Sequence, residues 1–171
     1  ALPICAIETH AAKNITITNS ELRNLGIGGI RIGNGSSDCA ITNSAIHDIS
    51  SSGIFIGNNT GHNHGYCDPG TDVTGVVVRN NYITRTGLDI FGSSAICALY
   101  TSDTVIDHNE VCYTTYTGIS LGWGWDWKNA PCSGNNTVSN NYIHDTGKTI
   151  HDGGSFYSLG LQEGTKVFGN Y

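Results

Sequence analysis

The sequence predicts an all-β fold, a right-handed parallel β-helix of about five coils. Two observations predict it: a six-residue phrase recurs along the chain of 171 residues, and a second phrase with the two-residue period of a β-strand follows each copy. Apolar residues with the spacing of an α-helix are absent over any useful length. Repeats of this kind are typical of solenoids, in which each coil packs on the next.

The first phrase consists of an apolar residue, any residue, an Asn-like residue, a polar residue, any residue and an apolar residue. It reads ITNSEL from Ile17, ITNSAI from Ile41, VRNNYI from Val78, IDHNEV from Ile106 and VSNNYI from Val138, and a broken copy, VFGNY, starts at Val167. The starts are separated by 24, 37, 28, 32 and 29 residues. We interpret this variation as loop insertions in a single solenoid domain over residues 1–171.

The second phrase predicts which side chains face the core. It reads GIRIG from Gly29, GIFIG from Gly53, CALYT from Cys97, GISLG from Gly118 and SFYSL from Ser155. Successive side chains of a strand point to opposite faces, so each copy predicts inward and outward residues. The expected inward residues are Ile30, Ile32, Ile54, Ile56, Ala98, Tyr100, Ile119, Leu121, Phe156 and Ser158. The expected outward row is Arg31, Phe55, Leu99, Ser120 and Tyr157.

Asparagine forms two columns in the predicted stack. Asparagine tolerates left-handed turn geometry, and stacked amides can form a hydrogen-bonded ladder. The first column is Asn19, Asn43, Asn80 and Asn140, with His108 and Gly169 in the same place. The second is Asn81, Asn109, Asn141 and Asn170, after Ser20 and Ser44. We expect both columns to be structural.

The ends of such a stack need a cover, because an open coil exposes unpaired backbone groups and apolar core residues. The N-terminal residues ALPI include no amphipathic helix that would serve as a cap, and Tyr171 lies inside a repeat. We therefore expect a segment of a longer helix, or ends that another chain or copy covers.

Composition excludes several classes of protein. Charged residues make up 13% of the chain, and 23 glycines stand beside only 3 prolines, which fits neither a disordered nor a collagen-like chain. No apolar run approaches the length of a membrane span. The net charge of −6 argues against general binding of phosphate backbones. We expect neither a membrane nor a nucleic acid as a partner.

Cysteines and glycosylation sequons predict a secreted protein with disulfides. The 6 cysteines form an even set without closely spaced pairs, which argues against a zinc site. N-x-[ST] sequons begin at Asn14, Asn34, Asn58 and Asn135. Free thiols in a cytosolic protein are the alternative. Cys39 and Cys67 each precede a first phrase in successive coils and are candidates for one disulfide, among the many pairings that the cysteines allow.

The insertion 58–72 holds another group of residues that could bind a cation, namely His62, His64 and Asp68. Histidine-rich surface loops are common, and no further ligand is fixed by the sequence. The acidic residues are scattered singly, whereas a calcium site needs several clustered oxygen ligands. We expect no metal and no cofactor.

Three stretches resemble a known family: AIHDISSSGIFIG at 45–57, TGISLGWGWDW at 117–127 and IHDTGKTIHDGGSFYSLG at 143–160. They are similar to β-helix proteins grouped around glycoside hydrolase family 141 and, more broadly, to the pectate-lyase-like superfamily. The resemblance covers residues 12–171, and Gly-Trp-Gly-Trp and Asp-Gly-Gly are its most specific parts. It implies a right-handed β-helix that hydrolyses glycosidic bonds.

The resemblance also implies roles for individual residues. Trp123 and Trp125 match tryptophans of the family, and Asp152 matches the aspartate before its glycine pair. The His-Asp pairs at 47–48 and 144–145 match a His-Asp that recurs in the family after the Asn turn.

Glycoside hydrolysis usually needs two carboxylates. Adjacent coils lie about 4.8 Å apart, so neighbouring coils could supply both. By register Asp126 and Glu163 form the best pair, whereas the resemblance favours Asp152. In the coil before Gly-Trp-Gly-Trp, relatives often show Ile-His-Asp where this chain has Val-Cys-Tyr at 111–113, so a carboxylate that could face Asp152 is missing there. A turn aspartate is the alternative role for Asp152.

Aromatic residues supply a candidate sugar-binding surface. Trp123, Trp125 and Trp127 alternate along GWGWDW, so their rings could share one side of an extended stretch. Aromatic faces stack on the apolar faces of sugar rings, and Tyr157 of the outward row could add a fourth ring. Packing of these tryptophans over a loop is the alternative.

Three hypotheses for function remain open from the sequence. The first is an extracellular carbohydrate-active enzyme that processes a polysaccharide or oligosaccharide. The second is a glycan-binding β-helix without catalysis. The third is a catalytically silent structural module of an extracellular assembly or filament, in which further copies or chains stack on the open coil ends.

Overall fold

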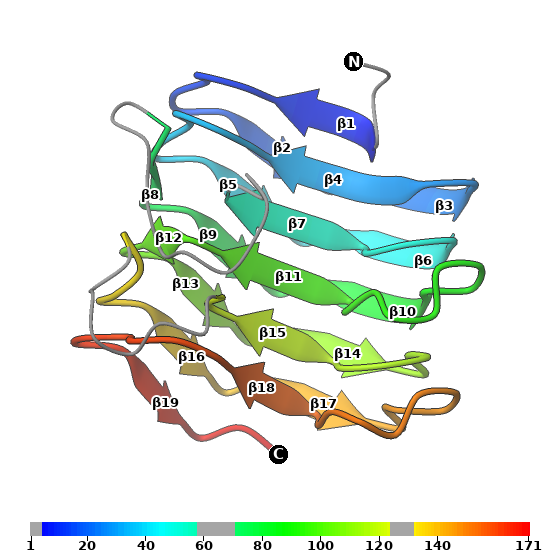
Figure 1. Cartoon of the computed structure of the whole chain (residues 1–171). Helices are drawn as coiled ribbons and strands as arrows, with labels where there is room; N and C mark the ends of the chain where they lie inside the picture. The colour runs from blue at the N-terminus through cyan, green and yellow to red at the C-terminus, as the bar shows by residue number, and fades with distance from the viewer. Residues whose placement is uncertain (1–4, 58–70, 124–131) are drawn as a thin grey trace.

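The computed structural model describes residues 5–57, 71–123 and 132–171, and its regular elements are stacked parallel strands (Figure 1). The expectation of an all-β parallel β-helix is confirmed. Three long sheets run along the stack, and each coil contributes one strand to each sheet except the last, which has strands in the first and third sheets only. The described residues contain no helix long and apolar enough to cross a membrane.

The first sheet contains β1 (Cys5–Thr9), β4 (Gly28–Ile32), β7 (Ile54–Gly57), β11 (Ile96–Leu99), β15 (Ile119–Leu121) and β18 (Phe156–Ser158). The second sheet contains β3 (Glu21–Leu25), β6 (Ala45–Ile49), β10 (Tyr82–Thr86), β14 (Glu110–Cys112) and β17 (Tyr142–His144). The third sheet contains β2 (Thr16–Thr18), β5 (Ala40–Thr42), β9 (Val77–Arg79), β13 (Val105–Asp107), β16 (Thr137–Ser139) and β19 (Lys166–Phe168). A fourth, two-stranded sheet pairs β8 (Val73–Thr74) with β12 (Thr101–Ser102).

The repeated phrases stack in register, coil on coil. In the third sheet the first residues of the copies are direct partners, and this column is Ile17, Ile41, Val78, Ile106, Val138 and Val167. Inserted residues therefore lie between the strands and leave the strand register intact.

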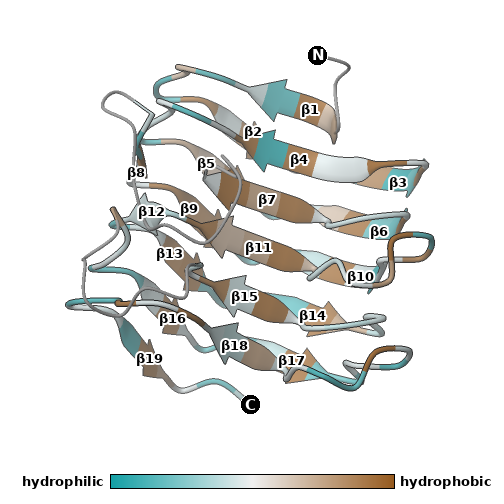
Figure 2. Ribbon diagram, viewed as in Figure 1, coloured by the Kyte–Doolittle hydropathy of each residue, from teal (hydrophilic) through white to brown (hydrophobic). Residues whose placement is uncertain are grey.

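The core is a set of stacked β-branched side chains. Ile30, Ile54, Ile96 and Ile119 lie one above another in the first sheet and are fully buried. Apolar colour accordingly concentrates along β7, β11 and β15 (Figure 2). Burying one such side chain stabilises the fold by roughly 1.5–3 kcal/mol, so the columns supply much of the stability. At the last coil Val167 is 48% exposed although its partner Val138 is buried.

The second asparagine column forms a hydrogen-bonded ladder inside the stack. Nδ2 of Asn81 donates to Oδ1 of Asn109 at 2.9 Å, and Asn109 donates likewise to Asn141 at 2.9 Å. Each Nδ2 also donates to a backbone carbonyl of the preceding coil, as Asn109 does to Val78 at 3.0 Å. The backbone N–H of Asn109 donates to Oδ1 of Asn141 at 2.9 Å. Every buried amide thus satisfies groups of two neighbouring coils.

The first asparagine column turns the chain between the third and second sheets. Asn43, Asn80 and Asn140 have φ values of 51°, 56° and 54°, and His108, which shares the column, has 52°. The expectation that this column needs a left-handed turn is confirmed. Nδ2 of Asn80 donates to Oδ1 of Asn43 at 2.7 Å, so this column too is bonded between coils.

A further set of left-handed residues lies near the C-terminal ends of the second-sheet strands and explains the recurring His-Asp. Asp48 and Asp145 have φ values of 57° and 51°. Asp48 lies 2.6 Å from Nδ1 of His47 and accepts two hydrogen bonds from Arg85, at 2.6 and 2.7 Å. The Arg85 guanidinium and then His47 hold the pKa of Asp48 well below its ordinary value, and Asp48 and Glu21 raise the pKa of His47. Here the motif is a turn with an ion-pair network.

One predicted strand register was wrong. Ile96 pairs with Ile54, so Cys97 takes the place in the outward row that we expected for Leu99. The error is a shift of two residues, because AICALY alternates equally well in either register and such a shift preserves which side chains face outward.

The predicted disulfide between Cys39 and Cys67 was also wrong. Cys39 is a free, buried thiol whose Sγ lies 3.3 Å from the carbonyl oxygen of Ser37, and Cys67 lies outside the described residues. The small side chain of Cys39 packs in the core at the start of a coil, as the side chains of free cysteines commonly do. Cys132, in contrast, is disulfide-bonded.

The ladder predicts that Asn109→Ala lowers the free energy of unfolding by about 3 kcal/mol, because buried groups of Asn81 and Asn141 lose their partner. Urea unfolding followed by circular dichroism measures this change. Asn80→Gly is the matched control, since Asn80 is exposed, has positive φ, and glycine occupies the same column at Gly169. We expect a change of about 1 kcal/mol or less in the control. Equal losses in both variants would contradict a structural ladder.

Candidate functional site

A groove of about 550 Å³ lies on the outer face of the first sheet. Its floor is the outward row, in which Phe55, Cys97, Ser120 and Tyr157 are direct partners on β7, β11, β15 and β18. The coil spacing of about 4.8 Å makes this row about 14 Å long. Beyond Phe55 the row continues with Arg31, whose guanidinium carbon lies 5.3 Å from the Phe55 ring centre.

Two similar loops form one wall of the groove. Residues 86–90 and 146–150 both read Thr-Gly-x-x-Ile, and each leaves the second sheet at a glycine with positive φ, Gly87 and Gly147. The backbone N–H of each glycine donates to the preceding coil, at 2.9 Å for Gly87 and 2.8 Å for Gly147. The loops then carry Ser93 and Asp152 to the groove.

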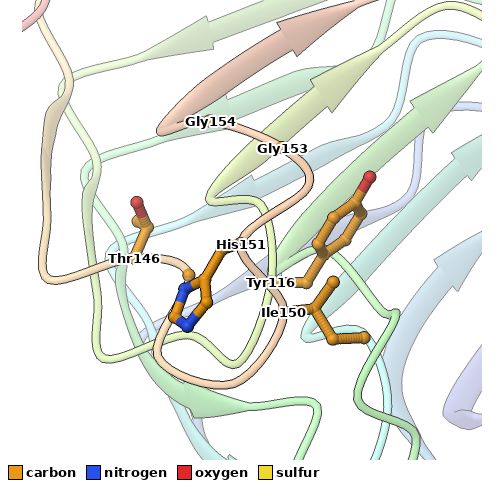
Figure 3. Close-up of a pocket in the computed structure, with 7 residues that line it drawn as sticks. Tyr116, Thr146, Ile150, His151, Gly153 and Gly154 are labelled. Carbon is orange, nitrogen blue, oxygen red and sulfur yellow. The ribbon is translucent and has the colours of Figure 1, made fainter.

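Tyr116 and Ile150 line both this groove and a smaller hollow of about 170 Å³, which Figure 3 shows. The loop that carries His151, Gly153 and Gly154 passes beside this ring (Figure 3). A Cβ atom on Gly153 would lie 2.8 Å from Cε2 of Tyr116 and 2.6 Å from Oγ1 of Thr117. Glycine is therefore required at this position for close packing, and this contact fixes the loop beside Asp152.

The remaining wall and rim combine hydroxyl and apolar groups. The full set of lining residues is Ser51, Ser52, Phe55, Gly92, Ser93, Ser94, Cys97, Leu99, Tyr116, Ser120, Trp123, Ile150, Asp152 and Tyr157. Burial raises the pKa of Cys97 to about 12, so this thiol stays protonated at neutral pH. The floor of the groove therefore has no charged side chain, and the negative charge among the lining residues comes from Asp152.

The structure brings together three of the predicted site residues. Trp123, Asp152 and Tyr157 all line the groove. Glu163 does not: it is exposed and forms a backbone bridge with Gly134. The expected register of Glu163 with Asp126 is not the one formed, because the chain between β15 and β16 contains more residues before the matching position. Asp126, Trp125 and Trp127 lie outside the described residues.

Sequence reasoning missed some members of the groove. Tyr116 and Ile150 belong to neither of the two phrases described above, and only the Thr-Gly-x-x-Ile similarity of the two loops could have indicated Ile150. Cys97 was missed through the register error. Asp152 is the one carboxylate among the described lining residues, so these residues alone do not assemble a pair for glycoside hydrolysis.

Comparison with known proteins places the fold in a family. Residues 5–171 match the model described as a right handed beta helix region. The chain belongs to the right-handed β-helix family. This β-helix is similar to a solved structure named "Glycoside hydrolase", with a TM-score of 0.87 and 29% identity over 98% of this chain and 30% of that chain. The chain thus spans about a third of the length of that protein.

A second solved structure is less similar to this β-helix. It is the alginate lyase from Paenibacillus sp. str. FPU-7, with a TM-score of 0.37 and 17% identity over 91% of this chain and 68% of that chain. No curated protein matches the chain.

The packing at Tyr116 predicts that Gly153→Ala destabilises the β-helix by about 1–3 kcal/mol, because the added methyl group overlaps Tyr116 and Thr117. Thermal unfolding measures the effect. Gly92→Ala is the matched control, since Gly92 also lines the groove but a Cβ there meets nothing within 4 Å. We expect its stability to change by about 0.5 kcal/mol or less. A control as damaging as Gly153→Ala would refute the packing argument.

Proposed function

We propose that this β-helix binds a polysaccharide or oligosaccharide in the groove and takes part in cleaving its glycosidic bonds. The observation that carries the proposal is the meeting of Trp123, Tyr157 and Asp152 in one groove on the first sheet. Support also comes from the similarity to a protein named "Glycoside hydrolase" over nearly all of this chain. Because the chain covers only part of that protein, the activity remains a proposal.

The chemistry of the groove suits a sugar chain. Aromatic faces of Trp123, Tyr157 and Tyr116 can stack on the apolar C–H faces of sugar rings. Serine hydroxyls on the rim and floor, such as those of Ser93 and Ser120, can exchange hydrogen bonds with sugar hydroxyls. The row crosses four coils, which gives an elongated surface open to solvent at the side and suits a linear ligand.

Asp152 is the proposed catalytic residue. It is exposed at the mouth of the groove and could protonate the leaving oxygen or attack the sugar carbon, the two roles that carboxylates take in glycosidases. A second carboxylate must come from elsewhere, and we propose Asp126 for this role, a predicted catalytic residue three positions after Trp123 in the sequence. The proposal therefore separates binding by the aromatic residues from catalysis by the carboxylates.

Binding is tested with a panel of neutral and acidic oligosaccharides, measured by calorimetry on the full chain. We expect Trp123→Ala and Tyr157→Ala each to weaken binding about tenfold, which corresponds to about 1.4 kcal/mol. Asp152→Asn should retain binding and lose any hydrolysis of the bound sugar. Phe168→Ala is the control, because Phe168 is 54% exposed on β19 of the third sheet and is not part of the groove.

The outcomes separate the three hypotheses. Binding with turnover that Asp152→Asn abolishes supports the enzyme. Binding without turnover supports a glycan-binding β-helix. If no sugar binds and sedimentation shows end-to-end assembly, the structural module is favoured, and the exposed core position at Val167 is then the surface to examine.

We also infer that the protein is exported. Cys132 is disulfide-bonded, and disulfides persist mainly in oxidising compartments. Two sequon asparagines, Asn14 and Asn135, are exposed at turns and therefore accessible to a glycosyl group, whereas Asn34 is only partly exposed. Intact mass after expression in a secreting eukaryotic host should show added glycans that Asn14→Gln and Asn135→Gln remove. A mass equal to that of the bare chain would refute glycosylation.

A further inference from the structure

Three metal-ligating side chains gather on the outer face of the second sheet, away from the groove. Glu110 and Cys112 lie on β14 and His144 on β17, two strands that are neighbours in the stack (Figure 1). Cys112 is the direct partner of His144, and Glu110 is placed diagonally to it. One ligand atom from each residue can be chosen so that all three lie within 4.8 Å of one another.

The imidazole of His144 is oriented as a metal ligand would be. Its Nδ1 lies 2.9 Å from a carboxylate oxygen of Asp145, so the ring proton belongs on Nδ1 and the lone pair on Nε2. Nε2 is buried and has no hydrogen-bond partner, and it lies 3.6 Å from Oε1 of Glu110. The Tyr142 ring stacks on the imidazole with 4.4 Å between the ring centres, and the Tyr113 ring meets it edge-on with 6.0 Å between the ring centres. These two contacts fix the plane of the imidazole.

The thiol of Cys112 has only weak partners. Its side chain is 1% exposed, and Sγ lies 3.4 Å from Oγ1 of Thr84 and 3.9 Å from the hydroxyl of Tyr82. A thiolate, an imidazole and a carboxylate are the donors that zinc takes in proteins, and calcium or magnesium would require oxygen ligands instead. The charges of a thiolate and a carboxylate would neutralise a divalent ion.

We propose that Glu110, Cys112 and His144 form a site for a divalent transition-metal ion with the preferences of zinc. The three side chains leave a fourth position for water. The ion would join β14 to β17 across two coils, and Asp145 would be a positioning residue that holds the imidazole through Nδ1. None of these residues lines the groove, so the proposal does not depend on sugar binding.

The chain contains an internal comparison three coils earlier. Glu21, Arg23 and His47 occupy the same strand positions as Glu110, Cys112 and His144. There Nε2 of His47 has a hydrogen-bond partner, since it lies 3.0 Å from Oε1 of Glu21. Arg23 occupies the position that corresponds to Cys112. The positively charged guanidinium of Arg23 repels a cation, whereas the thiolate of Cys112 would bind one. The unsatisfied Nε2 is therefore specific to the coil pair that has the cysteine.

The test is titration of the metal-free full chain with Co²⁺, followed by displacement with Zn²⁺. We expect one equivalent of Co²⁺ to produce a thiolate-to-cobalt charge-transfer band that Zn²⁺ abolishes. Cys112→Ser should lose the band, His144→Gln should weaken binding more than about 100-fold, and Asp145→Asn should weaken it about 10-fold. Zn²⁺ should raise the Tm of the wild-type protein and leave that of His144→Gln unchanged.

His47→Gln and Cys97→Ser are the matched controls, and both should keep the band and the stoichiometry. The proposal is overturned if no stoichiometric complex forms, or if Cys112→Ser keeps the charge-transfer band. His144 and Glu110 lie on the outer face, so His144→Gln and Glu110→Gln decide the matter even if Cys112→Ser does not fold.

Discussion

In-register stacking of parallel strands is the constraint on which the rest of this molecule depends. Once Ile41 lies over Ile17 and under Val78, every equivalent position becomes a spatial neighbour at about 4.8 Å. Isoleucine columns then close the core, and amide columns such as Asn109 over Asn141 satisfy buried backbone groups that water cannot reach. A polar residue is tolerated inside the stack because its neighbours in both directions carry matching groups.

The candidate sites arise where the stack departs from its simplest form. The two Thr-Gly-x-x-Ile loops rise beside the first sheet and convert an otherwise flat row of side chains into a groove. Gly153 sets how closely the second loop approaches Tyr116, and so decides where Asp152 lies. The rigid coils set the spacing between side chains, and the loops carry the binding and reactive groups, as is usual in solenoid proteins.

The parts that were predictable from the sequence are those that local chemistry determines. Asn43 and Asn80 could be placed because a left-handed turn restricts the choice of residue, and Ile54 because alternation is unambiguous beside glycine. Cys97 was placed two residues out of register, since alternation repeats with that period. Glu163 was misplaced because loop length between strands has no local signature. The Glu110, Cys112 and His144 group escaped notice because its members are far apart in sequence and meet only through register.

The two His-Asp pairs show why a motif alone does not assign chemistry in a β-helix. Both pairs close a left-handed turn, and in both the aspartate faces Nδ1 of its histidine. What differs is the neighbouring residues: Arg23 is the register partner of His47 and Arg85 donates to Asp48, whereas Cys112 is the register partner of His144. The side chains around His47 form an ion-pair network, whereas those around His144 form a set of possible metal ligands. The residue stacked on a motif, one coil away and some thirty positions distant in sequence, therefore decides what the motif can do.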